Sequence, residues 1–162
     1  MYDYSNITVK TRKTQAFVNT VAIGEAANTE IYPFVVDIGR VTVHNDAFRA
    51  VLRTGEHLQL TVMCIPAGED IGLEVHPHAD QFLCIQEGYG QVRMGETETH
   101  LPFVQPVFEN HAVLVPAGTW HNLINTGTGP LKLYSLYAPP QHARGAFHAT
   151  KAEAEKEEHY TL

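Results

Sequence analysis

Two stretches of this chain decide which fold it can adopt, EVHPHADQFLCIQEG (Glu74 to Gly88) and VPAGTWHNLIN (Val115 to Asn125). Each stretch places imidazole, carboxylate or amide side chains within short apolar runs that end at glycine, proline or asparagine. Short apolar runs separated by such turn residues are typical of β-strands. The two stretches therefore predict strands that bring polar side chains together around one divalent metal ion.

The surrounding sequence continues the strand pattern in both directions. Further short runs are HLQLTVMCI, which ends at the turn Pro66-Ala67-Gly68, and then GQVRMG, HAVLVP and LKLYSLY. Many short strands with regular turns predict an all-β antiparallel sandwich or barrel. Since there is no internal repeat, we expect one barrel.

The two ends of the chain are less regular than its middle. We predict a barrel over residues 51–140, an N-terminal extension over 1–50 that packs on the barrel or at a subunit interface, and a C-terminal tail over 141–162. Within the extension, NDAFRAVLRTG predicts a helical turn that leads into a strand. KAEAEKEEH permits a helix but has no apolar stripe, which favours a solvated helix or tail.

Composition excludes several classes of function. At 162 residues, with 44% hydrophobic and 18% charged residues, the chain is expected to be one globular domain. Its net charge of −7 disfavours nucleic acid as a partner, because phosphate binding needs a basic surface. No apolar run approaches the ~20 residues that span a bilayer, and the N-terminus lacks the apolar stretch of a signal peptide. We therefore expect no membrane partner and a cytoplasmic location.

Two sets of metal ligands compete within the first stretch. His76-Pro77-His78 is an imidazole pair two residues apart, but Pro77 cannot donate to a sheet and Pro-His-Ala-Asp resembles a turn, which would leave His78 at the rim. Glu74 and His76 have the same spacing within LEVH, which reads as a clean strand. We favour the second pair, joined by Gln81 on the returning strand and His121 on a third strand.

The favoured ligands are two imidazoles, one carboxylate and one amide oxygen, a set that leaves coordination positions open. It suits Fe(II), and Mn, Ni, Co and Zn are compatible, whereas a structural zinc knot or a calcium cage is not expected. Lone histidines are usually ordinary surface or core residues, and seven lack ligand-like spacing: His44, His57, His100, His111, His142, His148 and His159. Alternation along QFLCIQ turns Cys84 away from the site, and neither Cys64 nor Cys84 is assigned a role.

The two stretches resemble the two motifs of the cupin superfamily. Glu74-Val75-His76 stands where that family has a His-x-His pair, Gln81 stands at its glutamate, and Gly88 closes the first motif. The second motif is matched by Pro116, Gly118, His121 and Asn125, with Asn110 where glycine is usual. The run of motifs is similar to that of single-domain bacterial cupins of the phosphomannose isomerase-like (cupin 2) group. The resemblance implies a jelly-roll, or double-stranded β-helix, barrel.

Function is less determined than fold, because cupins include enzymes of several classes and plain binding proteins. We expect a metal-dependent isomerase or lyase that acts on a small oxygen-rich molecule, such as a sugar derivative or a keto-acid. A non-catalytic metal- or ligand-binding sensor is the first alternative, and an Fe(II)-dependent dioxygenase is the second.

Several further residues are candidates for roles in this site. Glu74 or His78 would act as the base, and Tyr134, Tyr137 and Arg53 are candidates for contacting substrate, although alternation cannot turn both tyrosines inward. The resemblance also leads us to expect a homodimer, in which the N-terminal extension covers an edge strand.

Overall fold

The computed structural model describes residues 33–159 and shows an all-β fold with two short helices. The helices are α2 (Ile38–His44) and α3 (Lys151–His159). The strands are β1 (Arg49–Thr54), β2 (Gln59–Ile65), β3 (Asp80–Glu87), β4 (Tyr89–Gly95), β5 (Phe103–Phe108), β6 (Ala112–Val115), β7 (Trp120–Asn125), β8 (Leu131–Ala138) and β9 (Phe147–His148).

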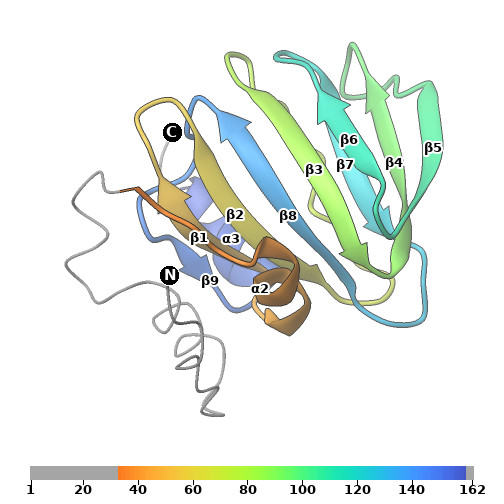
Figure 1. The fold of residues 1–162 in the computed structure, drawn as a ribbon. Coiled ribbons are helices and arrows are strands. Elements are labelled where there is room, and N and C mark those ends of the chain that lie inside the picture. The colour runs from red at the N-terminus through yellow and green to blue at the C-terminus, as the bar shows by residue number, and fades with distance from the viewer. Residues whose placement is uncertain (1–32, 160–162) are drawn as a thin grey trace.

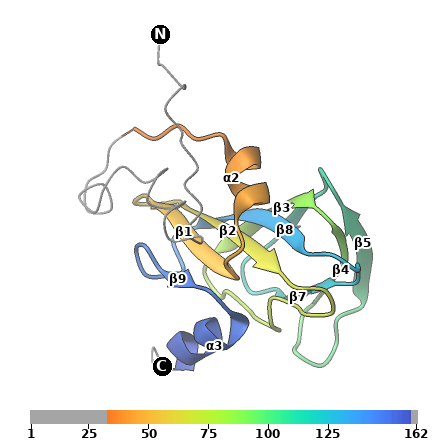
Figure 2. The same ribbon diagram turned by 90° about the horizontal axis from the view of Figure 1, so that it is seen from below.

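The strands form two antiparallel sheets that lie face to face (Figures 1 and 2). One sheet has six strands in the order β6-β3-β8-β2-β1-β9, and the other has three in the order β5-β4-β7. This arrangement confirms the predicted all-β jelly-roll barrel. β1 begins two residues before the predicted barrel boundary at 51, and β9 lies beyond the boundary at 140, so the C-terminal segment adds a strand to the larger sheet.

The inward-facing positions of four strands change from apolar to polar toward the same end of the barrel. The apolar positions are Ile85 and Leu83 in β3, Leu131 and Leu133 in β8, Ile65 and Met63 in β2, and Leu123 in β7. The polar positions at the other end are Gln81 in β3, Ser135 and Tyr137 in β8, Thr61 and Gln59 in β2, and His121 in β7. All of these side chains are buried. One half of the interior is therefore a hydrophobic core, and the other half is a buried polar site.

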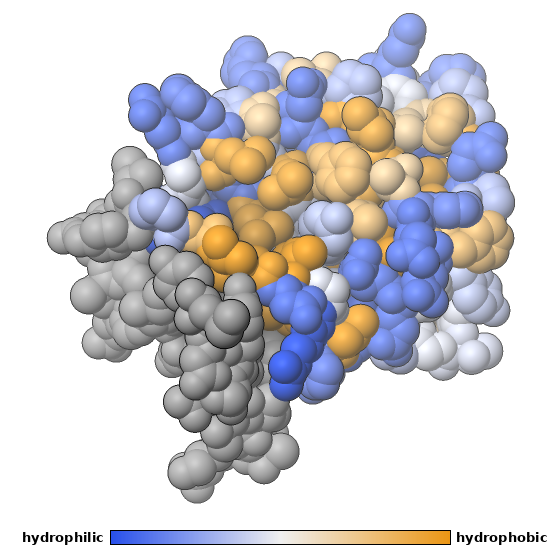
Figure 3. Space-filling model, viewed as in Figure 1, coloured by the Kyte–Doolittle hydropathy of each residue, from blue (hydrophilic) through white to orange (hydrophobic). Residues whose placement is uncertain are grey.

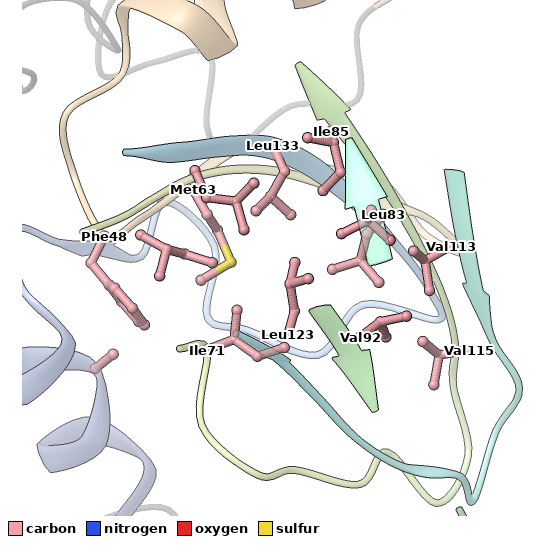
Figure 4. Close-up of a cluster of buried hydrophobic side chains, with 14 residues drawn as sticks. Phe48, Met63, Ile71, Leu83, Ile85, Val92, Val113, Val115, Leu123 and Leu133 are labelled. Atoms are coloured by element: carbon pink, nitrogen blue, oxygen red, sulfur yellow. The ribbon is translucent and has the colours of Figure 1, made fainter. Parts of the chain in front are cut away.

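The apolar half holds the two sheets together. Its side chains come from both sheets and point toward one another (Figure 4). Leu133 is 0% exposed and pairs with Met63 on one side and Ile85 on the other. Full burial of one such side chain stabilises the fold by roughly 1.5–3 kcal/mol. This core sets the spacing of the strands that carry the polar site.

Helix α2 covers the outer face of the six-stranded sheet (Figure 2). Its sequence, IGRVTVH, has weak helix propensity, but the Asp37 carboxylate caps it by accepting from the Arg40 backbone N–H, and Val41 packs against the sheet. The helix ends at His44, and residues 45–48 are not helical. The helical turn predicted within NDAFRAVLRTG is therefore wrong, while the strand predicted after it is β1.

The C-terminal segment forms the helix that its composition permits. It is not wholly solvated, because Ala154 is 2% exposed within the hydrophobic core and Lys151 forms an ion pair with Asp70. One small residue can be buried without an apolar stripe, which is why the pattern did not reveal it. Neither helix within residues 33–159 has the length and apolarity that crossing a bilayer requires.

Candidate metal centre

Glu74 and His121 are placed side by side by the backbone. The Glu74 N–H donates to the His121 carbonyl at 3.0 Å, and the His121 N–H donates to the Glu74 carbonyl at 2.9 Å. Two residues that exchange both bonds are direct antiparallel partners, so their side chains leave the same face. The carboxylate and the imidazole therefore meet inside the polar half of the barrel.

The segment LEVH is not the regular strand that was predicted, but Glu74 and His76 do face the same site. Glu74 forms only an isolated bridge with His121, and the neighbouring bridge joins Asp70 to Ile124. Four residue steps on one side thus oppose three on the other, as in a β-bulge. Gly72, at φ +95°, lies in this irregular stretch, and its N–H donates to the Asp70 carboxylate. Glu74 and His76 nevertheless converge on one site.

Two imidazole nitrogens converge on one carboxylate oxygen. His121 Nε2 lies 3.2 Å and His76 Nε2 3.4 Å from Glu74 Oε1. One ligand atom from each of the three residues lies within 4.8 Å of the others. His121 is 1% exposed, whereas His76 and Glu74 are 14% and 16% exposed, so solvent reaches the site from their side.

The hydrogen bond of His121 Nδ1 indicates that a cation belongs between His121 Nε2 and Glu74. His121 Nδ1 lies 2.9 Å from the Thr119 carbonyl oxygen, which can only accept, so Nδ1 carries a proton. In the neutral ring, Nε2 then presents a lone pair to the Glu74 carboxylate oxygen, and two acceptors repel at this distance. A cation between them, either a proton or a metal ion, removes the repulsion. A hydrogen bond from Nδ1 to a carbonyl also orients a metal-ligating histidine.

Gln81 supplies a further oxygen to the same interior. Its Nε2 donates to Tyr137 OH at 3.0 Å and to Ser135 Oγ at 3.2 Å. Its Oε1 is buried and has no hydrogen-bond partner within residues 33–159, and the same holds for Thr61 Oγ1. Buried polar atoms are normally satisfied by protein groups, ordered water or ions, and a metal ion at this cluster would give Gln81 Oε1 a partner. This donor set fits a divalent transition metal ion, for which the chain would supply two nitrogens and two kinds of oxygen.

The positive charge of Arg49 lies beside the Glu74 carboxylate. Its guanidinium is buried, and Nη2 lies 3.9 Å from Glu74 Oε2, which leaves Oε1 to the two histidines. Burial alone would raise the pKa of Glu74, but the hydrogen bonds and charge of His121 and His76 outweigh it and hold that pKa well below its ordinary value. Glu74 is therefore an anion, the form in which a carboxylate binds a metal ion.

Comparisons with known proteins identify the family of this chain. A family model described as the cupin domain matches residues 61–137. The crystal structure of BH2720 from Bacillus halodurans is 57% identical in sequence, with a TM-score of 0.77 over 79% of this chain and 97% of that chain. This protein belongs to the cupin superfamily.

Two relatives known by sequence are uncharacterised. YrkC of Bacillus subtilis (strain 168) is 57% identical over 122 residues, which are 75% of this chain and 66% of YrkC, so the match spans just under two thirds of that relative. A protein of Acanthamoeba polyphaga mimivirus is 35% identical over 113 residues, 69% of each chain. Neither name states an activity.

The structure separates the remaining candidates for this cupin site. Tyr137 is buried, and its ring meets that of His76 at 5.4 Å. Tyr134 lies on the opposite face of β8, near Phe82, and Arg53 lies over the ring of Phe34. His78 is exposed in the predicted turn. Of these four residues, the structure brings only Tyr137 to the metal centre.

His142 and Arg49 are site residues that the sequence reasoning missed. The His142 ring lies 4.9 Å from that of Tyr137, on a loop held by Gln59, whose amide accepts from the His142 N–H and donates to its carbonyl. His142 Nε2 is buried without a hydrogen-bond partner among the described residues. Neither residue lies in a motif, so only their packing against motif residues identifies them.

The buried His142 predicts a pH dependence of stability. Burial, followed by the charge of Arg49, lowers the pKa of His142 from 6.5 to about 3. The unfolded chain therefore binds the extra proton between these values, and the free energy of unfolding falls as pH drops below 6.5. From pH 7 to pH 5 this group is expected to remove about 2 kcal/mol.

Urea unfolding of His142→Phe at both pH values checks this expectation. The phenyl ring keeps the contact with Tyr137 but cannot titrate, so this variant should lose about 2 kcal/mol less than the unmodified protein between pH 7 and pH 5. His57→Phe, at a side chain that is 85% exposed, should behave as the unmodified protein does. Equal losses in all three proteins would contradict the assignment.

Proposed function

We propose that this cupin binds one divalent transition metal ion, held by Glu74, His76, Gln81 and His121. The supporting observation is the convergence of two imidazole nitrogens on Glu74 Oε1, with His121 Nδ1 engaged by the Thr119 carbonyl and Gln81 Oε1 without a partner in the described part of the chain. The two-histidine, one-carboxylate core favours Fe(II), and Mn, Ni, Co and Zn are compatible ions.

We further propose that the protein is a metal-dependent isomerase or lyase that acts on a small oxygen-rich molecule. A bound ion would polarise a carbonyl or hydroxyl group of such a molecule. The chain's own contribution is orientation: Arg49 forms an ion pair with Glu74 Oε2, and Gln81 donates hydrogen bonds to Ser135 and Tyr137. Glu74 is the proposed proton acceptor once it leaves the metal, because His78 lies on an exposed turn away from the centre.

Metal content is the first test of the proposed function. Protein purified without added metal, or reconstituted with each candidate ion in turn, is expected to hold close to one ion per chain by elemental analysis. Glu74→Ala and His121→Ala should lose the ion, because each variant lacks one of its ligands. The affinity should fall by roughly 100-fold or more.

His78→Ala is the matched control, since it removes an imidazole two residues from His76 on an exposed turn. It should keep the full metal content. An unmodified protein that takes up no ion under any condition, or a His121→Ala variant that keeps its ion, would refute the proposed ligand set.

Two alternatives make different predictions on the metal-loaded protein. A non-catalytic binding cupin would bind ligands without turnover. An Fe(II)-dependent dioxygenase is favoured by the two-histidine, one-carboxylate set and would consume oxygen only when Fe(II) is bound. Oxygen uptake by the iron form with a panel of diketones and thiols separates the dioxygenase from the isomerase or lyase.

We also propose a cytoplasmic homodimer, and an apolar row on the outer face of the larger sheet supports the dimer. Figure 3 shows hydrophobic residues gathered on that face. Cross-strand partners form the row, and Leu114 at its edge is 69% exposed. Its members are Leu60, Leu136, Phe82 and Leu114. A monomeric mass by light scattering would count against the dimer.

A further inference from the structure

A cleft opens at the end of the barrel that holds the metal centre. It has a volume of about 580 Å³ and lies between the connection from β4 to β5 and the turn from β6 to β7. Both connections lie at the end of the barrel where β3 begins, close to Gln81 (Figure 1). Sites of this volume commonly bind small molecules. The cleft is therefore large enough for part of a substrate.

The lining of this cleft is mainly apolar. Its large apolar residues are Met94, Pro102, Phe103 and Pro116, and its polar side chains are Glu96, His100 and Thr119. Phe103 is 48% exposed, so much of its ring surface faces solvent until a ligand covers it. None of the described residues that line the cleft is Lys or Arg. Such a surface favours an apolar group and offers no cation to a phosphate group.

Hydrogen bonds hold both walls of the cleft in place. In the β4–β5 connection, the His100 N–H donates to the Thr97 carbonyl at 3.1 Å, and a Cβ at Gly95 would clash with the His100 carbonyl oxygen. In the β6–β7 turn, the Ala117 N–H donates to the Asp80 carboxylate at 2.9 Å. The cleft is therefore formed before a ligand arrives, and binding needs little further ordering of the chain.

The cleft shares one wall with the metal centre. The Gly118 N–H donates to the His76 carbonyl at 2.9 Å, and the Thr119 carbonyl accepts from His121 Nδ1 at 2.9 Å. Met94 is the cross-strand partner of His121. Gly118, Thr119 and Met94 all line the cleft. Antiparallel partners have Cα atoms about 5 Å apart, so one small molecule can reach both the cleft and the metal centre.

We infer that the molecule bound at the metal centre carries an apolar group, of the size of a phenyl ring or a branched alkyl chain, and that this cleft holds the group. In the proposed function, on which this inference rests, the ion takes oxygen atoms of the same molecule. The ring of Phe103 and the thioether of Met94 contact the apolar group. The substrate is then an aromatic or branched oxo or hydroxy compound and not a sugar phosphate.

Calorimetric titration of zinc-loaded protein with acetohydroxamate and with benzohydroxamate tests this assignment. Both probes bind a metal ion through the same two oxygen atoms, and they differ by a methyl group against a phenyl ring. Benzohydroxamate is expected to bind at least about 10-fold more tightly, as for a phenyl ring that is largely removed from water. Equal affinities, or no binding of benzohydroxamate, would overturn the inference without any variant.

Variants then assign the preference to the cleft. Phe103→Ser should bind benzohydroxamate about 5-fold more weakly and acetohydroxamate as before, because only the phenyl contact is lost. Phe108→Ser is the matched control, since Phe108 is also 48% exposed on β5 but does not line the cleft. It should keep the full preference. An unchanged preference in folded Phe103→Ser would remove the cleft from the ligand site.

Failure of the proposed function has a separate signature, because the zinc content is measured in the same samples. If the unmodified protein takes up no zinc, the metal-binding proposal fails. Titration of metal-free protein with benzamide and with acetamide, followed by the NMR signal of the Met94 methyl group, then decides the role of the cleft. A shift that saturates with benzamide alone would retain the apolar site, and no shift would overturn it as well.

Discussion

Adding a saturating divalent ion to metal-free protein is expected to raise the free energy of unfolding by about 4 kcal/mol when the free ion is near a thousand times its Kd. The folded chain brings Glu74, His76 and His121 within 4.8 Å of one another, whereas the unfolded chain separates His121 from the other two by more than forty residues. The ion therefore binds the folded state preferentially and stabilises it.

Urea titrations with EDTA and with each buffered ion measure this effect. The gain should disappear in His121→Ala and persist in His78→Ala. It should also shrink as pH falls, because protons compete with the ion for the imidazole nitrogens. Identical unfolding midpoints with EDTA and with every ion would contradict the metal-centre proposal.

Replacing Leu133 by alanine is expected to destabilise the fold by about 4 kcal/mol, the range seen for fully buried leucines. Leu133 is 0% exposed on β8, between Met63 of β2 and Ile85 of β3. With partners on both sides in one sheet, the cavity cannot readily collapse. Urea unfolding at fixed metal concentration gives the change directly.

Leu58→Ala is the matched control, because this leucine is 49% exposed between β1 and β2 and lies outside the proposed dimer row. It should change the free energy of unfolding by about 0.5 kcal/mol or less. Folded Leu133→Ala should still bind its ion, since Leu133 lies in the apolar half of the barrel. A loss below about 1.5 kcal/mol would show that the site repacks.

Period-two alternation identified much of the barrel. In β3 it placed Gln81, Leu83 and Ile85 on the inner face and Cys84 on the other, and the burial of these residues follows that pattern. The turn at Pro77 and His78 was also predicted correctly. Asn110, where the family motif usually has glycine, has φ +66°, a conformation that asparagine tolerates better than most residues.

The strand FVQPVF shows where local patterns are insufficient. It was not among the predicted strands, and its Pro106 lacks the N–H of a sheet donor. The segment is β5, an edge of the three-stranded sheet, where one side of a strand needs no partner. Whether a strand lies at an edge depends on the whole sheet.

The sequence by itself determined most of the strand pattern and the spacing of Glu74 and His76, because these depend on residues close together in the chain. The jelly-roll form of the barrel followed from the resemblance of the two motifs to those of cupins. Tertiary structure decided that His121 faces Glu74, through reciprocal backbone bonds across a bulge. It also decided that Arg49 and His142, from segments outside the motifs, enter the same interior. Strand pairing and loop packing bring such residues together across long sequence separations, and no local spacing records that contact.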